Sequence, residues 1–300
     1  MKYCNMAVFA ASVAVMLLAF TSIASAGTFS SVIVYGDSLS DNGNLYLATG
    51  QPPAPYYDGR FSNGPVAVEQ LAGMLDAPLY DFAWGGATTG IGNYGDGGTQ
   101  TSSGTLSLPG MIPEFEESGP VLSTLNRSTS LFVVWGGAND FFSGGSPLVA
   151  AEDIDFIVSS LEADGATHIL VPNLPNLGLT PEFYGSAAAT SYAETFNADL
   201  QASLPAGAVY FDTFDLMTDI VSDPSAYGLT NVTAPCFNGA TVCSDPSQYL
   251  FWDGVHPTTT ADTILADGFY SEVTPEPSSI LLLGTGIAGL TGLLRMRRAA

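Results

Sequence analysis

Short apolar segments that alternate with longer helical segments constrain the fold of this 300-residue chain more than any other feature. The short segments have the length and the β-branched or aromatic composition of buried strands, and the longer ones space their apolar residues as helices do. The predicted strands are 32–35, 79–84, 131–135, 168–171 and 208–211, and the predicted helices are 63–75, 111–117, 147–163, 186–204 and 258–273. The alternation predicts an α/β fold with a parallel, doubly wound sheet.

Polar or glycine residues follow three of these strands directly. Ser38 comes two residues after Gly36, Gly86 follows the second strand, and Asn139 follows the third. Because the carboxyl ends of parallel strands meet at one edge of a sheet, these groups could converge there. Ser38 is a candidate nucleophile that would need a base. Taken alone, it could also be a helix cap, and Gly86 and Asn139 could serve ordinary turns.

The base has to come from one of two histidines. His168 opens a predicted strand, and we expect it to be structural. His256 follows Asp253 by three residues, a spacing at which one turn of chain can aim the carboxylate at the imidazole. This pair alone could form a capped surface turn. Together with Ser38 it forms a candidate triad in the order Ser, Asp, His.

Four blocks of the sequence, in order, resemble the motifs of the GDSL (also called SGNH) hydrolase family of lipases and esterases. The blocks are Gly36-Asp37-Ser38-Leu39-Ser40-Asp41-Asn42-Gly43-Asn44, residues 81–88, Gly137-Ala138-Asn139-Asp140 and Asp253-Gly254-Val255-His256-Pro257. Residues 171–178 also look like a segment of this family. One departure is visible, because Asp81 stands where the family usually has asparagine. That position lies outside the candidate triad.

The resemblance implies a three-layer α/β/α, flavodoxin-like fold with a five-stranded parallel sheet, the SGNH hydrolase fold, over residues 27–273. It implies catalysis by Ser38, Asp253 and His256. The backbone N–H groups of Ser38 and Gly86 and the side-chain amide of Asn139 would form the oxyanion hole. No metal or cofactor is expected, since the sequence has neither a P-loop nor a dinucleotide motif between a strand and a helix.

These features predict a secreted serine hydrolase that cleaves carboxylic esters of lipids, small alcohols or acylated glycans. Two alternatives remain open. One is a polysaccharide O-deacetylase of the extracellular matrix. The other is a non-catalytic matrix protein built on the same scaffold.

Both ends of the chain have the composition of targeting signals. Residues 1–26 combine an early lysine, an apolar run and Ala24-Ser25-Ala26, which predicts a secretory signal peptide cut before Gly27. A retained anchor is the alternative. Residues 274–300 join a Pro-Glu-Pro motif, an apolar run at 280–294 and an arginine cluster. This order resembles the PEP-CTERM sorting signal of Gram-negative bacteria, and a plain membrane anchor is the alternative.

The PEP-CTERM resemblance implies a processing partner and a destination. An exosortase-type enzyme would remove the tail near Pro-Glu-Pro, after transient membrane association through the C-terminal helix. The mature protein would then reach the cell surface or the extracellular matrix.

The formal net charge of −23 also bears on partners. So acidic a chain repels phosphate backbones and anionic lipid headgroups, and we therefore expect no nucleic-acid partner. Acidity of this kind also suits the surface of a secreted protein.

Two further segments leave alternatives open. Cys236 and Cys243 share a polar loop of an exported chain, so a disulfide is expected, with two free thiols as the alternative. Zinc is not expected there, because no histidine or further cysteine is near. The segment 90–120, rich in Gly, Ser and Thr, is predicted to be a lid, a wall of the substrate cleft or a solvated insertion.

Overall fold

The computed structural model describes residues 29–274. Within them lies a five-stranded, fully parallel sheet with the strand order β2-β1-β3-β4-β5, so the predicted α/β class and parallel sheet are confirmed. The signal-peptide prediction for 1–26 and most of the predicted sorting segment lie outside the described residues. The strands are β1 (Val32–Gly36), β2 (Leu79–Asp81), β3 (Leu131–Trp135), β4 (Ile169–Pro172) and β5 (Ala208–Phe211).

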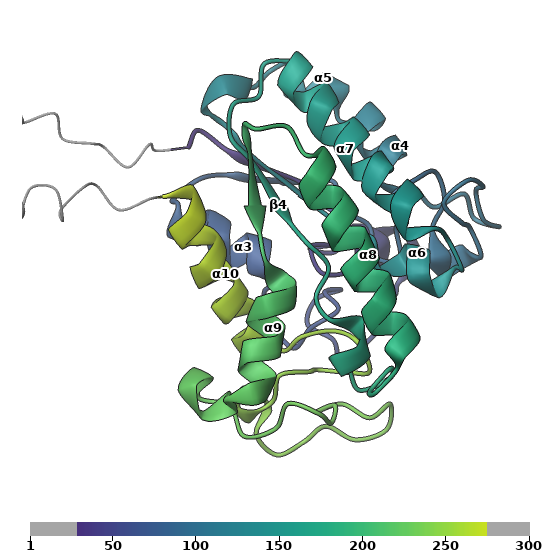
Figure 1. The fold of residues 1–300 in the computed structure, drawn as a ribbon, viewed down its shortest axis with the longest axis vertical. Helices are drawn as coiled ribbons and strands as arrows, with labels where there is room; N and C mark the ends of the chain where they lie inside the picture. Colours follow the sequence, from purple (N-terminus) through teal and green to yellow (C-terminus); the bar gives the residue numbers. More distant parts are fainter. Residues whose placement is uncertain (1–28, 275–300) are drawn as a thin grey trace, which may run out of the picture. The chain divides into compact units, whose positions relative to one another are not determined.

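Helices cover both faces of the sheet (Figure 1). One face of the sheet forms a hydrophobic core with three helices, α4 (Met111–Glu117), α7 (Pro147–Ala163) and α8 (Ala187–Ser203). On the other face lie α3 (Ala67–Met74) and α10 (Thr259–Val273). The remaining helices are α2 (Asn44–Thr49), α5 (Gly119–Leu122), α6 (Ala138–Phe142) and α9 (Thr213–Ser222), with short 3-10 turns η1 (Tyr94–Asp96), η2 (Arg127–Thr129), η3 (Leu177–Leu179), η4 (Pro224–Tyr227) and η5 (Pro246–Gln248).

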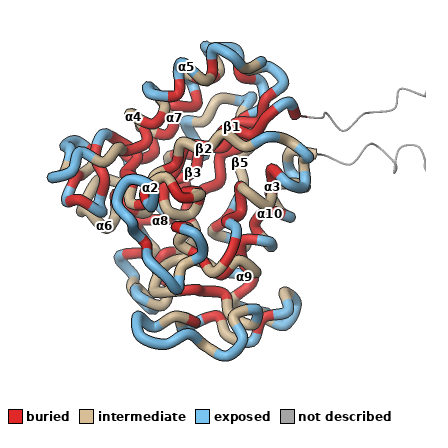
Figure 2. Tube along the Cα trace, turned by 180° about the vertical axis from the view of Figure 1, so that it is seen from behind, coloured by how far each residue is buried: buried red, intermediate tan, exposed pale blue. Residues whose placement is uncertain are grey.

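Strict alternation along the central strands fills the two cores. Ile33 and Tyr35 of β1 belong to the core under α7 and α8, whereas Val32 and Val34 belong to the core under α3 and α10. All residues of β1, β3 and β4 are buried, whereas those of the edge strands β2 and β5 are of intermediate burial (Figure 2). Full burial of each such side chain contributes about 1.5–3 kcal/mol. The central strands are therefore a stable support for the candidate site residues that follow them.

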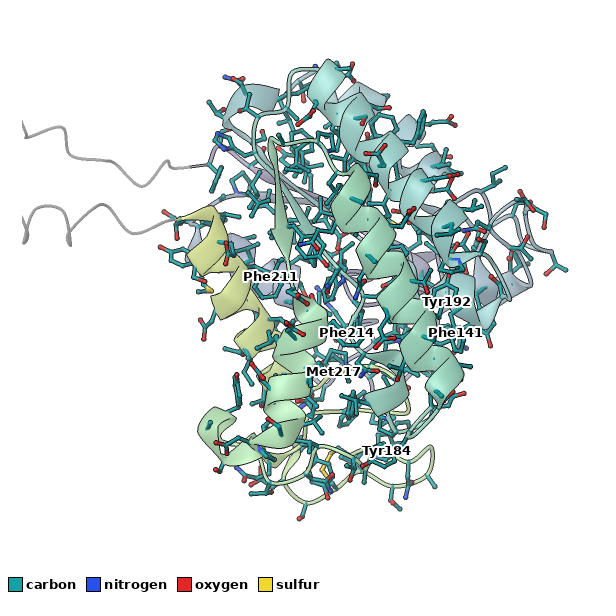
Figure 3. The ribbon with its side chains drawn as sticks, viewed as in Figure 1. Phe141, Tyr184, Tyr192, Phe211, Phe214 and Met217 are labelled. Atoms are coloured by element: carbon teal, nitrogen blue, oxygen red, sulfur yellow. A yellow bond between two sulfur atoms is a disulfide. The ribbon has the colours of Figure 1, made fainter. Side chains whose placement is uncertain are left out.

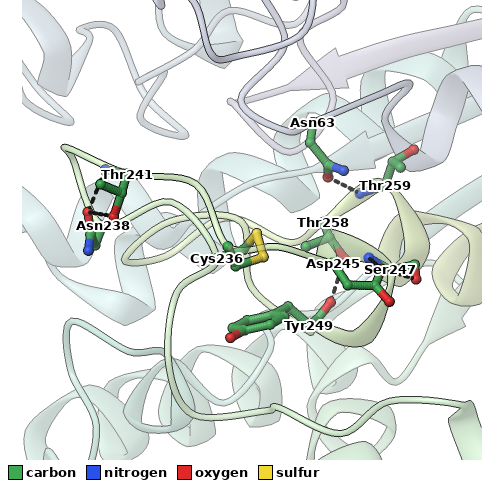
Figure 4. The surroundings of a disulfide bond; sticks show 10 residues. Asn63, Cys236, Asn238, Thr241, Asp245, Ser247, Tyr249, Thr258 and Thr259 are labelled. Carbon is green, nitrogen blue, oxygen red and sulfur yellow. Dashed lines mark hydrogen bonds between the residues drawn. A yellow bond between two sulfur atoms is a disulfide. The ribbon is translucent and has the colours of Figure 1, made fainter.

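The structure corrects two local predictions. The second strand ends at Asp81 rather than at residue 84, because the Asp81 carboxylate accepts the Ala83 N–H and turns the chain. Helix α3 begins at Ala67, later than the predicted cap at residues 63–64. Asn63 instead caps α10, where its side-chain oxygen accepts the Thr259 N–H at 2.9 Å (Figure 4).

Helix α9 was not expected from the sequence, which predicted only a polar loop after β5. It starts because Asp212 caps it, accepting the Asp215 N–H, and because Asn173 holds its first turn by accepting the Phe214 N–H at 3.0 Å. Met217 on this helix packs into a third, smaller apolar core with residues of the following loops and α10. Figure 3 shows Phe214 and Met217 along α9.

The long segment between α9 and α10 has little regular structure beyond η4 and η5. A disulfide between Cys236 and Cys243 closes part of it (Figure 4). The Cys236 N–H also donates to the Phe251 carbonyl at 3.0 Å, which ties the disulfide to the chain just before Asp253. Within residues 29–274, no helix is long and apolar enough to cross a membrane.

Candidate active site

Ser38 lies at the carboxyl edge of the sheet, where β1 ends. A side chain at Gly36 would collide with the Trp135 carbonyl of the neighbouring strand, so only glycine fits there. Asp37 then organises the turn, since its backbone carbonyl accepts the N–H groups of Ser40 and Asp41 and its carboxylate accepts that of Leu39 at 3.0 Å. This turn fixes Ser38 in place immediately beyond the rigid strand.

The imidazole of His256 joins Ser38 to Asp253. His256 Nε2 lies 2.8 Å from Ser38 Oγ, across 218 positions of sequence. On the other side of the ring, Nδ1 lies 2.8 Å from Asp253 Oδ2. The carboxylate is itself held in place, because Asp253 Oδ1 accepts the backbone N–H groups of Val255 and His256 at 2.9 and 2.8 Å. The three candidate residues therefore form one continuous hydrogen-bonded array.

Tyr56 is also part of this array, and the sequence analysis did not identify it. Its phenol donates to Asp253 Oδ2 at 2.7 Å. The Tyr56 ring is wedged edge-on among Phe61, Phe237 and Trp252, with centroid distances of 6.0, 5.7 and 6.3 Å. No local motif marks this tyrosine, because its partner lies 197 residues away and it follows a proline-rich loop.

The candidate oxyanion donors lie beside Ser38 in one cleft. In the described part of the chain, the N–H groups of Ser38 and Gly86 have no protein acceptor and are open to a ligand. Gly86 adopts φ +86°, and a Cβ there would collide with Asn93 Oδ1. Asn139 uses its amide to donate to the Ala87 carbonyl at 3.0 Å and, more weakly, to Asp37 Oδ2 at 3.3 Å. The weaker bond, to Asp37, uses the amide hydrogen that Asn139 could instead donate to a ligand oxygen.

The charges around the imidazole set its protonation. Burial acts to lower the pKa of His256, but the charge and hydrogen bond of Asp253, with contributions from Asp37 and Glu182, outweigh burial and raise the pKa above 6.5. For Asp253 burial acts to raise the pKa, but the His256 charge and the hydrogen bonds from His256, Tyr56 and Val255 lower it well below its usual range. The pair is thus poised as a carboxylate and an imidazole that is more basic than a free one.

Several further carboxyl groups are buried near the site. Burial raises the pKa of Asp37 to about 6, despite the Leu39 N–H that it accepts. Asp81, at the position where the family resemblance leads one to expect asparagine, accepts the N–H groups of Asn42 and Ala83, and burial raises its pKa well above the ordinary value. Glu114 accepts the Gly36 N–H at 2.9 Å, so α4 supports the end of β1 directly.

Two pockets meet at Ser38 and His256. One is a cleft rimmed by Gly86, Tyr94, Phe183 and Glu182, which includes the open oxyanion donors. The other is a narrow apolar pocket that extends beneath Ser38 between the sheet edge, α9 and α10. The first cleft answers one question left by the sequence: in the segment 90–120, Tyr94 and Gly95 form part of the cleft wall.

The 90–120 wall is held by buried polar residues rather than left in solvent. Asn93 is fully buried and donates to the Gly85 carbonyl at 2.9 Å. Asp96 is buried and accepts the N–H groups of Leu106 and Leu108 at 2.9 and 3.1 Å. These contacts favour a fixed wall over a solvated insertion.

His168 lies away from this site. It precedes β4, at the amino edge of the sheet, and its ring packs edge-on against Phe29 at 5.2 Å. Within residues 29–274, no cluster of three or more His, Cys, Asp or Glu side chains is arranged to hold a metal ion.

Comparison with known proteins gives matches over most of the chain. The profile of the GDSL-like lipase/acylhydrolase family matches residues 32–269, and that of the PEP-CTERM protein-sorting motif matches residues 273–298. The thermolabile hemolysin of Vibrio parahaemolyticus is 26% identical over 271 residues, which cover 79% of this chain and 62% of the hemolysin. The phosphatidylcholine-sterol acyltransferase of Aeromonas hydrophila is 29% identical over 236 residues, 71% of this chain and 67% of that protein.

One match is to a solved structure. The acetylxylan esterase Axe2 of Geobacillus stearothermophilus matches 82% of this chain and 95% of its own, with 14% identity and a TM-score of 0.45. The chain spans less than two thirds of the length of the hemolysin.

Proposed function

Because the chain belongs to the family of GDSL-like lipases and acylhydrolases, we propose that it hydrolyses carboxylic esters with Ser38 as the nucleophile. His256 is the general base and Asp253 the group that orients and stabilises it. The observation that carries the proposal is the 2.8 Å contact between Ser38 Oγ and His256 Nε2, with Asp253 on the opposite ring nitrogen.

In the proposed acylation step, Ser38 Oγ attacks the ester carbonyl carbon while its proton passes to His256 Nε2. Asp253, bonded to the protonated Nδ1, stabilises the imidazolium that forms. The carbonyl oxygen becomes an oxyanion, which accepts hydrogen bonds from the N–H groups of Ser38 and Gly86 and from the Asn139 amide. Each such donor typically supplies about 3–4 kcal/mol of transition-state stabilisation.

Collapse of this intermediate breaks the bond to the alcohol oxygen, and His256 Nε2 returns its proton to that oxygen. The acyl group is left as an ester on Ser38. A water molecule then gives a proton to His256 and attacks the acyl carbon. The second intermediate releases the carboxylic acid and restores the Ser38 hydroxyl.

Turnover of p-nitrophenyl butyrate and labelling by a fluorophosphonate probe test this function. We expect both activities in the wild-type protein and neither in Ser38→Ala, with a rate loss of at least about 10³-fold in His256→Ala. Ser40→Ala is the matched control. Ser40 is buried two residues away, and its hydroxyl has no hydrogen-bond partner in the described chain. Full activity of a folded Ser38→Ala variant would refute the proposal.

We also propose that the enzyme acts outside the cytoplasm. The PEP-CTERM match supports this, since that motif is a protein-sorting signal. In this proposal residues 1–26 direct export, and an exosortase-type enzyme removes the segment beyond Pro-Glu-Pro after it has associated with the membrane. Intact mass measurement of protein recovered from the producing cells tests both events. A mature protein that retains both ends would contradict them.

A further inference from the structure

We propose that the narrow apolar pocket beneath Ser38 binds the acyl chain of the substrate, so that the enzyme prefers esters of fatty acids with chains of several carbons over acetyl esters. The inference rests on the proposed ester hydrolysis and goes beyond it by naming the substrate class. It also decides between a lipid-type ester and the acetylated polysaccharide that the sequence left open.

The pocket begins at the reacting atoms. Ser38 and His256 are among the residues that line it, together with Asp37 and Asn139. A substrate carbonyl carbon in contact with Ser38 Oγ would therefore have this opening next to it. The pocket is in this sense a continuation of the candidate active site and not a separate surface groove.

The walls of the pocket are hydrocarbon side chains from elements far apart in the sequence. They come from η3, α9, the loop before Asp253 and α10: Leu177, Met217, Ile220, Leu250, Ala261 and Leu265. All six are less than 10% exposed. Two threonines are the other polar groups of the wall. The Thr180 hydroxyl donates to the Leu177 carbonyl, and the Thr213 hydroxyl has no partner within residues 29–274.

The position of α9 gives the pocket its shape. Asn173 fixes the start of this helix, because it accepts the Phe214 N–H at 3.0 Å and donates to Asp212 Oδ1 at 2.9 Å. Met217 and Ile220, one turn apart on α9, then face the pocket across from α10. A preformed apolar pocket of this kind favours an alkyl chain, since each methylene moved out of water strengthens binding about fourfold.

The acyl group, rather than the alcohol, is the part that fits this pocket. During turnover the alcohol must leave before water can attack the ester on Ser38, while the acyl chain stays covalently attached. The cleft on the other side of Ser38 is wider and mixed in its lining, with Glu182 and the open Gly86 N–H among aromatic side chains, so the alcohol and the water can occupy it. The narrow pocket is lined almost wholly by hydrocarbon and leaves them little room, so it suits the part that remains.

The first test compares p-nitrophenyl octanoate with p-nitrophenyl acetate, both below their aggregation concentrations. We expect kcat/KM for the octanoyl ester to exceed that for the acetyl ester by about 100-fold or more, since each methylene moved out of water is worth about fourfold and about six are added. Octyl acetate, in which the long chain is on the alcohol, should gain no such advantage. Equal rates on the two p-nitrophenyl esters, or a preference for octyl acetate, would overturn the assignment.

The second test fills the pocket. We expect Ile220→Trp to lower kcat/KM for the octanoyl ester at least about 50-fold while the acetyl ester changes less than about 3-fold. Val221→Trp is the matched control, because Val221 is the next residue of α9, is only half-buried and does not line the pocket. Ala261→Leu fills the pocket from α10 and serves if the tryptophan variant does not fold. Parallel losses on both esters would contradict a role in chain selection.

A binding measurement separates failure of this inference from failure of the proposed function. Calorimetry with Ser38→Ala, which cannot turn over, should show octanamide binding at least about 30-fold more tightly than butanamide, and this difference should be lost in Ser38→Ala/Ile220→Trp. Such a result would support the pocket even if the wild-type protein had no esterase activity. Esterase activity without selective octanamide binding would leave the proposed function standing and overturn the pocket.

Discussion

The phenol of Tyr56 and the carboxylate of Asp253 are joined by a hydrogen bond of 2.7 Å across 197 positions of the chain. The bond goes to Oδ2, the oxygen that also faces His256 Nδ1 at 2.8 Å. A fourth residue therefore shares the carboxylate that orients the candidate base. The Tyr56 ring also packs against Phe237, which is next to Cys236. The disulfide-bonded loop therefore contacts a residue that is hydrogen-bonded to Asp253.

Tyr56→Phe keeps the ring and removes only this hydrogen bond. We expect kcat to fall about tenfold, or about 1.4 kcal/mol, which is in the range of a hydrogen bond to a charged group. Because the carboxylate becomes more basic, the ascending limb of the pH profile should also move to higher pH. Tyr57→Phe is the control, because the Tyr57 side chain lies exposed on the same loop. An unchanged pH profile in Tyr56→Phe would mean that Tyr56 only packs.

The pH dependence of activity follows from the raised pKa of His256. The imidazole must be neutral to accept the Ser38 proton, so kcat/KM should rise with pH along a limb centred above about 6.5. Asp253→Asn removes the charge that contributes most to raising that pKa. We expect its limb to move to lower pH and its kcat to fall about 10³–10⁴-fold. Profiles measured with a neutral ester at constant ionic strength check both, and a limb that stays in place in Asp253→Asn would contradict the electrostatic account.

Gly86→Ala should impair catalysis far more than stability. The φ of +86° strains any side chain by about 1–2 kcal/mol, and the added Cβ collides with Asn93 Oδ1 and moves an N–H proposed for the oxyanion hole. We expect kcat to fall about 10²-fold or more. Gly97→Ala has almost the same φ, +84°, with nothing near its Cβ, so it should show the same loss of stability with normal kcat. Equal kcat in the two variants would argue against Gly86 as a donor.

Stability should increase when the solution is made mildly acidic. Burial raises the pKa of Asp37 to about 6 and that of Asp140 to about 7, above the value of about 4 in an unfolded chain. The folded state therefore binds more protons than the unfolded state. The stabilisation that these two carboxyl groups contribute is complete below about pH 4 and is lost as pH rises through their folded-state pKa values. We expect the free energy of unfolding to be at least about 2 kcal/mol larger at pH 5 than at pH 8. Urea titrations check this, and Asp140→Asn should flatten the dependence.

The disulfide should contribute to stability through a short closed loop. Cys236 and Cys243 are separated by 7 positions, for which chain entropy predicts about 2.5 kcal/mol. We expect the double variant Cys236→Ala/Cys243→Ala to lose about that much in urea unfolding. The wild-type protein under reducing conditions should show the same loss, and the double variant should be indifferent to reductant. A wild-type protein unaffected by reductant would mean that the bond contributes nothing measurable.

Local patterns in the sequence were enough for most of the fold. The third and fifth strands and helices α4 and α7 have the predicted bounds, because each carries a complete apolar repeat and its own start or stop signal. The second strand came out too long because Asp81 turns the chain through a side-chain contact that periodicity does not record. Helix α9 was missed, although Asp212 followed by apolar residues at 214, 217 and 220 is a signal of a capped helix.

The candidate site was predictable only in part, for a physical reason. The positions after strand ends indicated Ser38, Gly86 and Asn139, and the short spacing from Asp253 to His256 indicated the second half. Contacts formed only by the folded chain left no such pattern. The bonds from Tyr56 to Asp253 and from Gly36 to Glu114 join residues 197 and 78 positions apart. A local sequence motif cannot indicate pairs so far apart.

The proposed nucleophile and its base lie on segments that differ in their free energy of local unfolding. Ser38 follows a strand whose five residues are all buried, whereas Asp253 and His256 sit in a stretch whose regular structure between Gly228 and Thr258 is limited to η5. Segments of the second kind open at free energies well below that of global unfolding. Heat should therefore separate hydroxyl from imidazole while the sheet still gives its full circular dichroism signal. The upper working temperature of such a protein would be set by a loop and its cross-link, and enlarging the hydrophobic cores would do little to extend it.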